Sequence, residues 1–297
     1  MQNIDPIYIA QPVIVIAACV ALLVYWHRRR GFEWNVLAYA FLAYAAAITL
    51  KYAVQIPTIT TVTDYFGQQS VGLGLYYGAQ TMFFEVGMAY VVALYAVRRG
   101  KLGRRDAEGY GAGLAFWENA VLLGAFSLLS LVAYYAILST SLPVAQTVYS
   151  TLNKDEPGLF APAYQAVVSV ALGTTERFSS ILIHSAWGYL CVMAAVLNKK
   201  RLFAVALPMG LVDFLVPFAS SIGVALFEGI VFVIGVISVL VAWLAVKAVA
   251  MDIGSGQDPP AANPSEGAND WGATHSSPRP GAQYGSASPV RTMDKED

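Results

Sequence analysis

Apolar runs long enough to cross a membrane recur through the first 250 residues of this chain. A helix needs about 20 such residues to span the hydrocarbon core of a bilayer, so each run is a candidate transmembrane helix. The chain is 57% hydrophobic and only 12% charged, whereas a soluble globular protein usually carries about twice that charged fraction. We therefore expect an integral, multi-pass protein of the plasma membrane whose partner is the lipid bilayer. The composition does not indicate a nucleic-acid partner.

The predicted fold is an all-α bundle of about seven transmembrane helices. Two cysteines, Cys19 and Cys191, fall inside apolar runs and are expected to be buried apolar residues rather than a disulfide. The spans lie at roughly 7–26, 35–53, 72–97, 109–137, 174–197, 202–221 and 223–250.

The distribution of Lys and Arg predicts the orientation of these helices. Three short loops, which follow the first, third and fifth spans, hold eleven of the fifteen basic residues that precede the C-terminal tail. The alternate loops are nearly free of positive charge, since segment 54–71 has none and segment 138–173 has only Lys154. Basic loops stay on the cytoplasmic side of a membrane, so we predict an outer N-terminus and a cytoplasmic C-terminus.

Two segments do not fit the pattern of simple spans. Segment 138–173 is long for a connection, and its apolar second half, 160–172, is too short to span, so we expect an interfacial or re-entrant helix there. If it did span, the count would become eight and the basic cluster at 199–201 would face outward. Residues 251–297 are rich in Gly, Pro, Ser and Ala, which predicts a disordered cytoplasmic tail after a transmembrane domain at 1–250.

Four ionisable residues lie well inside the spans, where each costs about 2.5–3.5 kcal/mol on insertion scales. Counted at about 1.5 Å per residue from the cytoplasmic end of each span, their depths fall between about 14 and 20 Å. Polar groups at one level on successive helices predict a shared site in the interior of the bundle. The four residues are Glu85, Glu118, His184 and Asp213.

Three carboxylates and one imidazole can ligate a metal, relay protons or activate water. Asn119 is a candidate supporting residue of such a site, and so are Glu176 and Arg177, which are otherwise interfacial anchors. A polar residue in a span can also do no more than bond a neighbouring helix, and that interpretation suits any one of the four taken alone. Lys51, near the outer end of the second span, can snorkel toward the interface.

Four sequence segments carry a resemblance to a known family. They are FFEVGMAYV around Glu85, GAGLAFWEN leading to Glu118, ERFSSILIH ending at His184 and, after a short basic loop, ALPMGLVDFLVPF around Asp213. Together they resemble the YhfC-type intramembrane metalloproteases, relatives of the PrsW proteases and of the broader CAAX-protease and bacteriocin-processing superfamily. The similarity covers roughly residues 70–220, and its strongest part is ERFSSILIH with the basic loop that follows.

The resemblance implies roles for these residues. Glu85 matches a glutamate that activates a water molecule, and Glu118 matches a second acidic residue with a catalytic or metal-binding role. His184 matches a metal-ligand histidine, and Asp213 matches the last residue of an HxxxD motif that contributes to the metal site. The matches imply a divalent metal, zinc if the family chemistry is retained, and hydrolysis of a peptide bond in a peptide or membrane-protein substrate.

The chain departs from the family pattern at three positions. Phe84 stands where a second glutamate is usual, and Met88 stands where an arginine is usual. Met209 stands at the histidine position of the HxxxD motif, so His184 is the one histidine at the predicted site, which argues for loss of activity and favours metals harder than zinc. Three functions remain open: an intramembrane metalloprotease, an inactive relative that acts as a membrane scaffold or binding protein, and a proton-coupled carrier.

Overall fold

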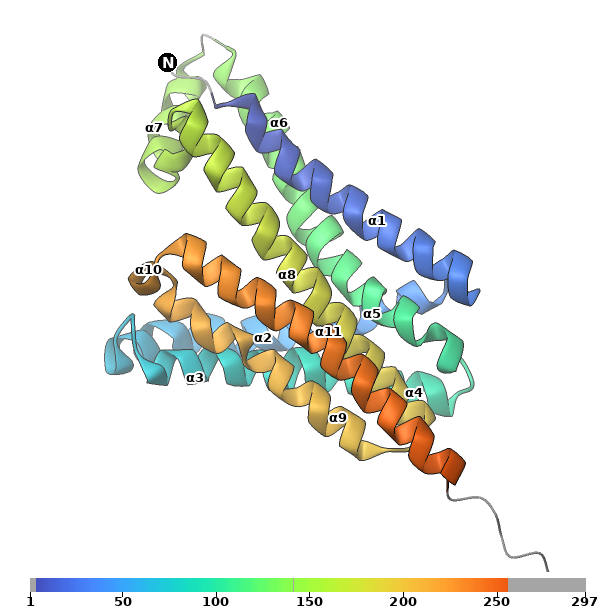
Figure 1. Ribbon diagram of the computed structural model, residues 1–297. Coiled ribbons are helices and arrows are strands. Elements are labelled where there is room, and N and C mark those ends of the chain that lie inside the picture. Colours follow the sequence, from blue (N-terminus) through green and yellow to red (C-terminus); the bar gives the residue numbers. More distant parts are fainter. Residues whose placement is uncertain (1–3, 141, 256–297) are drawn as a thin grey trace, which may run out of the picture. The chain divides into compact units, whose positions relative to one another are not determined.

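The computed structural model describes residues 4–140 and 142–255, and the regular structure of these residues is entirely helical (Figure 1). Seven helices are long and apolar enough to cross a membrane, which confirms the predicted all-α, multi-pass fold. Most of the predicted tail, 256–297, lies outside the described residues. The helical segments, in chain order, are η1 (Pro6–Ile9), α1 (Ala10–Arg30), α2 (Val36–Phe66), α3 (Val71–Gln80), η2 (Thr81–Val86), α4 (Gly87–Arg98), η3 (Arg104–Asp106), α5 (Ala107–Ala115), η4 (Phe116–Ala125), α6 (Phe126–Leu138), α7 (Pro143–Asp155), η5 (Pro157–Phe160), α8 (Ala163–Val196), α9 (Lys200–Ala206), η6 (Leu207–Phe218), α10 (Ala219–Ile222) and α11 (Val224–Ser255).

Three of the spans change helix type midway along their length. Val71–Arg98 passes through the π-helical segment η2, and Arg104–Leu138 passes through the π-helical segment η4. Lys200–Ile222 passes through η6, which is a 3-10 helix. Short π-helical turns within α-helices occur frequently at functional sites. The side chains on η2 and η4 are therefore candidate site residues.

The connection before the fifth span differs from the prediction. α7 forms a separate helix, whereas α8 begins at Ala163, so most of the segment 160–172 is the first part of the fifth span rather than an interfacial or re-entrant helix. Gly173 does not end this helix. A Cβ at this position would meet only the end of the flexible Gln11 side chain, at 2.6 Å from Nε2. The described residues contain seven candidate spans.

α8 is the central helix of the bundle. In its most apolar 18-residue stretch 72% of the residues are buried, against 17–44% in the other six spans. It packs most extensively on α5 and also contacts α1, α4 and α9. Cys191 on α8 and Cys19 on α1 are both buried and free, as predicted. The apolar part of α8 around His184 is therefore enclosed by other helices rather than by lipid.

Glycines bring the helices around the site into backbone contact. A Cβ at Gly111 of α5 would lie 2.4 Å from the carbonyl oxygen of Ser185, and a Cβ at Gly188 of α8 would lie 2.5 Å from the Cα atom of Gly111. In the same way, a Cβ at Gly210 of η6 would lie 2.6 Å from the Cα atom of Met82 in η2. Small residues allow transmembrane helices to approach this closely, so these contacts fix the spacing of the segments that carry the site.

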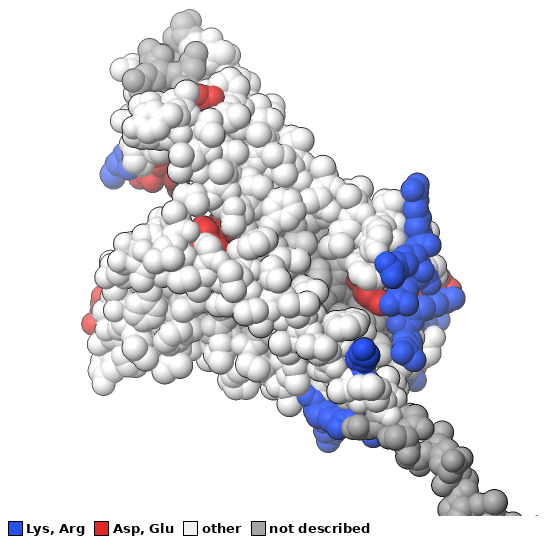
Figure 2. Space-filling model, viewed as in Figure 1, with Lys and Arg blue, Asp and Glu red and all other residues white. Residues whose placement is uncertain are grey.

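Lys and Arg side chains gather at one end of the helical bundle (Figure 2). This end includes the last turn of α1, with Arg28, Arg29 and Arg30, and the beginning of η3 at Arg104. The segregation agrees with the three basic loops that the sequence places on one side of the membrane. The orientation of the termini in the membrane stays a prediction.

Candidate metal centre

His184 lies near the middle of α8, where the preceding turn of the helix fixes its ring. Nδ1 is 2.9 Å from the carbonyl oxygen of Ser180, and since a carbonyl oxygen only accepts, Nδ1 carries the hydrogen and donates it. The ring also contacts Trp187, with 4.2 Å between the ring centroids. A hydrogen bond at one ring nitrogen sets the role of the other, so Nε2 is the atom available to a metal or to an acidic partner.

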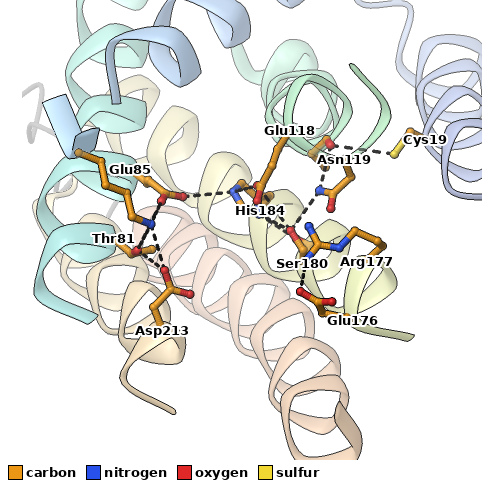
Figure 3. Close-up of polar contacts among 12 residues, drawn as sticks. Cys19, Thr81, Glu85, Glu118, Asn119, Glu176, Arg177, Ser180, His184 and Asp213 are labelled. Atoms are coloured by element: carbon orange, nitrogen blue, oxygen red, sulfur yellow. Dashed lines mark hydrogen bonds and ion pairs between the residues drawn. The ribbon is translucent and has the colours of Figure 1, made fainter. Parts of the chain in front are cut away.

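Two carboxylates face Nε2 of His184 (Figure 3). Oε2 of Glu118 lies 2.5 Å from Nε2, and Oε2 of Glu85 lies 3.5 Å from it. One ligand atom from each of the three residues lies within 4.8 Å of the other two, and we call these residues the donor group. Glu85 and His184 are only 8% and 5% exposed. A buried group of this kind is stable only where protons or a cation balance its charges.

The acidic residues of the predicted site lie on helical segments that are not α-helical. Glu85 belongs to η2, Glu118 belongs to η4, and Asp213 belongs to η6. A π-helical turn contains an additional residue, so it changes the direction of the side chains around it relative to a regular helix. Glu85 and Glu118 therefore project from π-helical segments, and Asp213 projects from a 3-10 segment.

A half-buried lysine forms a second polar cluster, the lysine cluster of Lys51, Thr81 and Asp213, beside the donor group. Nζ of Lys51, from α2, lies 2.6 Å from Oε1 of Glu85 and 3.1 Å from Oδ2 of Asp213. It also donates to the Thr81 hydroxyl at 2.9 Å, and that hydroxyl in turn donates to Asp213. Lys51 therefore does not snorkel toward the interface as the sequence allowed, because the attraction of two interior carboxylates holds its ammonium group inside. Glu85 links the donor group to the lysine cluster, because its Oε1 faces Lys51 and its Oε2 faces His184.

Ser180 connects the imidazole to a buried amide. Its hydroxyl oxygen lies 3.2 Å from Nδ1 of His184 and 3.5 Å from Oε2 of Glu118. The same oxygen accepts a hydrogen bond of 3.1 Å from Nδ2 of Asn119. Asn119 is fully buried, and its Oδ1 has no hydrogen-bond partner among the described residues. Buried amide oxygens are nearly always bonded, so this one marks a place where water or a ligand can donate.

Glu176 and Arg177 lie about two turns before His184 on α8 and form an ion pair with each other. Both line a cavity of about 520 Å³ whose wall also includes Asn119 and Gln11. The pair therefore borders a cavity that reaches Asn119 and does not belong to the donor group.

The structure brings three of the four predicted residues into one group and places the fourth in the lysine cluster. Glu85, Glu118 and His184 form the donor group. Asp213 is bound by the lysine and is not a member of that group. Met209, at the position where a histidine was expected, is buried in the apolar core and lines an apolar cleft with neighbours such as Leu215 and Ile234.

Three residues of the two clusters were not predicted: Lys51, Thr81 and Ser180. Thr81 and Ser180 each lie four positions before a predicted site residue, and residues at this spacing share one face of a helix. That spacing was the sequence signal that could have identified them. Lys51 carried no such signal, because both of its acidic partners come from other spans.

The donor group fits a divalent metal. Imidazole nitrogen and carboxylate oxygen are common metal ligands, and a catalytic site keeps a position open to water. The bond from Nδ1 of His184 to a backbone carbonyl is also the usual arrangement for a metal-binding histidine. One nitrogen and two carboxylates favour harder ions such as Mn²⁺ or Fe²⁺ more than a nitrogen- and sulfur-rich site would.

Comparison with known proteins agrees with the geometry of the site. No curated protein and no solved structure matches the chain. The sequence profile of the family described as YhfC intramembrane metalloprotease matches residues 13–241, a range that contains all three residues of the donor group and the lysine cluster. This match covers most of the chain, and it identifies the protein as a member of the YhfC intramembrane metalloprotease family.

Proposed function

We propose that this protein is a metal-dependent intramembrane peptidase that cleaves a peptide bond in a membrane protein or peptide. The observation that carries the proposal is the position of Nε2 of His184 between carboxylate oxygens of Glu118 and Glu85, at 2.5 and 3.5 Å. Membership of the YhfC intramembrane metalloprotease family supports metal-dependent cleavage of a peptide bond as the class of reaction. The buried position of the group supports chemistry within the bundle rather than at its surface.

We assign metal binding to His184 and Glu118, because their facing atoms are the closest pair in the donor group. A divalent metal bound there would supply a Lewis acid that polarises a carbonyl oxygen or a water molecule. Glu85 accepts the proton of the attacking water through Oε2, the oxygen that is not bonded to Lys51. Lys51 holds Oε1 and thereby fixes the direction in which Oε2 points.

Asp213 has a different role in this proposal from the metal ligand that the sequence resemblance implies. Its Oδ2 lies 3.1 Å from Nζ of Lys51 and accepts a hydrogen bond from Thr81. Metal binding through this oxygen would require both bonds to break. We therefore assign Asp213 to the positioning of Lys51, and through Lys51 to the orientation of Glu85.

Metal content tests the proposal directly. Wild-type protein purified from metal-replete cells is expected to carry about one divalent ion per chain, and His184→Ala is expected to carry none, because the nitrogen ligand is removed. Elemental analysis by mass spectrometry measures both. The matched control is His27→Ala, since Nδ1 of His27 also lies 2.9 Å from a carbonyl oxygen but the residue is outside the donor group. Wild-type protein without metal would contradict the proposal.

Ser180 is expected to tune the affinity of this site. Removing a group that bonds a metal ligand typically weakens metal binding by about 10- to 100-fold, so Ser180→Ala should raise the metal Kd by at least about tenfold. Competition with a fluorescent chelator measures the change. Ser179→Ala is the neighbouring control, because the Ser179 hydroxyl donates to the carbonyl oxygen of Thr175 at 2.8 Å instead. Equal affinities for the two variants would exclude this role for Ser180.

The second candidate function is an inactive family member that acts as a membrane scaffold or binding protein. Two observations favour it: Met209 replaces an expected ligand within an apolar environment, and Lys51 forms ion pairs with both Glu85 and Asp213. The two candidates differ in one measurable respect. A scaffold keeps its fold without metal and cleaves no substrate when metal is supplied.

A further inference from the structure

A basic cavity opens at the end of the bundle where α1 ends and η3 and α5 begin. Its volume is about 550 Å³, and its wall contains residues of α1, η3, α5, α8 and α11. Lys and Arg side chains gather at this end (Figure 2). The lining contains no residue of the donor group. Its charged members are Arg29, Arg30, Arg104, Lys247 and Glu108.

The cavity carries an excess of positive charge. Four cationic side chains face one carboxylate, and that carboxylate is already paired, because Oε1 of Glu108 lies 2.5 Å from Arg30. Arg104 forms no ion pair with any acidic side chain in the described part of the chain. The charges of Arg29, Arg104 and Lys247 are thus not balanced within the cavity, which favours an anionic ligand.

Two of these cations lie over tryptophan rings. The guanidinium carbon of Arg29 is 5.9 Å from the ring centroid of Trp26, and Nζ of Lys247 is 5.1 Å from that of Trp243. Tryptophan is enriched at the level of the lipid headgroups, where its ring contacts both the apolar and the polar layers. The cations of the cavity are therefore expected at the depth of the membrane phosphates.

The rest of the wall is apolar. Val239, Leu240 and Val246 of α11 form one side, where α11 passes the other helices. Ser185 of α8 also lines the cavity, and its buried hydroxyl has no hydrogen-bond partner among the described residues. A ligand that fills this space must combine a negative charge, an apolar part and an oxygen that accepts a hydrogen bond.

We propose that this cavity binds one anionic phospholipid. The phosphate lies against Arg29, Arg104 and Lys247, an acyl chain covers the apolar side of α11, and an ester oxygen accepts from Ser185. A soluble anion would use the cations and leave the apolar side uncovered, whereas a lipid uses both. Basic pockets between transmembrane helices at the cytoplasmic side are typical sites for anionic headgroups.

Native mass spectrometry of the detergent-purified full chain tests the proposal. The protein is equilibrated with phosphatidylglycerol or with phosphatidylcholine, and the fraction of chains that retain one lipid gives the relative affinity. The double variant Arg104→Gln/Lys247→Gln removes two unbalanced cations and should weaken retention of phosphatidylglycerol by about 30-fold. The matched control is Lys101→Gln/Lys200→Gln, which removes two exposed cations that do not line the cavity.

The expected result is retention of phosphatidylglycerol over phosphatidylcholine by the wild type and by the control, and loss of that preference in the cavity variant. Equal retention of the two lipids by the wild type would overturn the proposal. So would an equal loss in the cavity variant and the control, because general surface charge would then explain binding. Inorganic phosphate is the third ligand in the experiment, and displacement of the lipid by phosphate at an equal concentration would identify a soluble-anion site instead.

Discussion

Replacing Glu85 by Gln is expected to lower the rate of peptide-bond cleavage by about 10²- to 10⁴-fold, the usual contribution of a general base. The substitution keeps the size of the side chain and removes the oxygen that would accept the proton of water. Wild-type and variant proteins are reconstituted in proteoliposomes with a library of transmembrane peptides, and the new termini are counted by mass spectrometry. Because His184 and Glu118 remain, Glu85→Gln should keep most of its bound metal.

Glu228→Gln is the control for this substitution. Glu228 is also a buried glutamate, 5% exposed, but it is not a member of the donor group. Its variant should cleave at nearly the wild-type rate. A Glu85→Gln protein that holds metal and still cleaves normally would exclude Glu85 as the base, and loss of metal from this variant would assign Glu85 to the ligand set instead.

Replacing Lys51 by Met is expected to lower the free energy of unfolding by about 3–5 kcal/mol, the usual cost of breaking a buried ion pair by removing one partner. The loss is large because Glu85 and Asp213 would then lie near each other without a cation, and Glu85 is buried. Thermal unfolding in detergent, followed by circular dichroism, measures the effect. Lys154→Met is the control, because Lys154 is exposed and forms no ion pair with another described residue.

A double substitution separates the ion pair from a general effect of the apolar replacement. Asp213→Asn in the Lys51→Met background removes one of the two unbalanced charges, so the double variant should be more stable than Lys51→Met alone. Lys51→Arg keeps the charge and should fall between the wild type and Lys51→Met. If Lys51→Met were as stable as Lys154→Met, the two contacts of 2.6 and 3.1 Å would contribute nothing to the fold.

The sequence predicted the membrane fold well, because the length of an apolar run is a direct measure of its ability to span a bilayer. The start of α8 was less predictable. The prediction began the fifth span at residue 174 and made 160–172 a separate helix, whereas α8 is continuous over Ala163–Val196. The π-helical form of η2 and η4 had no sequence signal, whereas Pro208 and Pro217 in η6 disfavour a regular α-helix.

For the site, the sequence predicted only the depth of each residue in the membrane. Counting residues along each span placed Glu85, Glu118 and His184 near one level, and the structure brings them together. Depth does not determine which side of a helix faces a given neighbour, and Asp213 contacts Lys51 and Thr81 rather than the donor group. The direction of the lysine side chain depended on those acidic partners, which no local pattern reveals.

The ion pair between Lys51 and Glu85 also bears on how the chain enters the membrane. It joins the second and third spans, which are separated only by residues 67–70, so the two helices can insert together as a hairpin. Each charged residue alone would add about 2.5–3.5 kcal/mol to the cost of insertion. A hairpin that inserts with the pair already formed exposes no isolated charge to lipid, and the contact can therefore assist biogenesis before the later spans that complete the site have been synthesised.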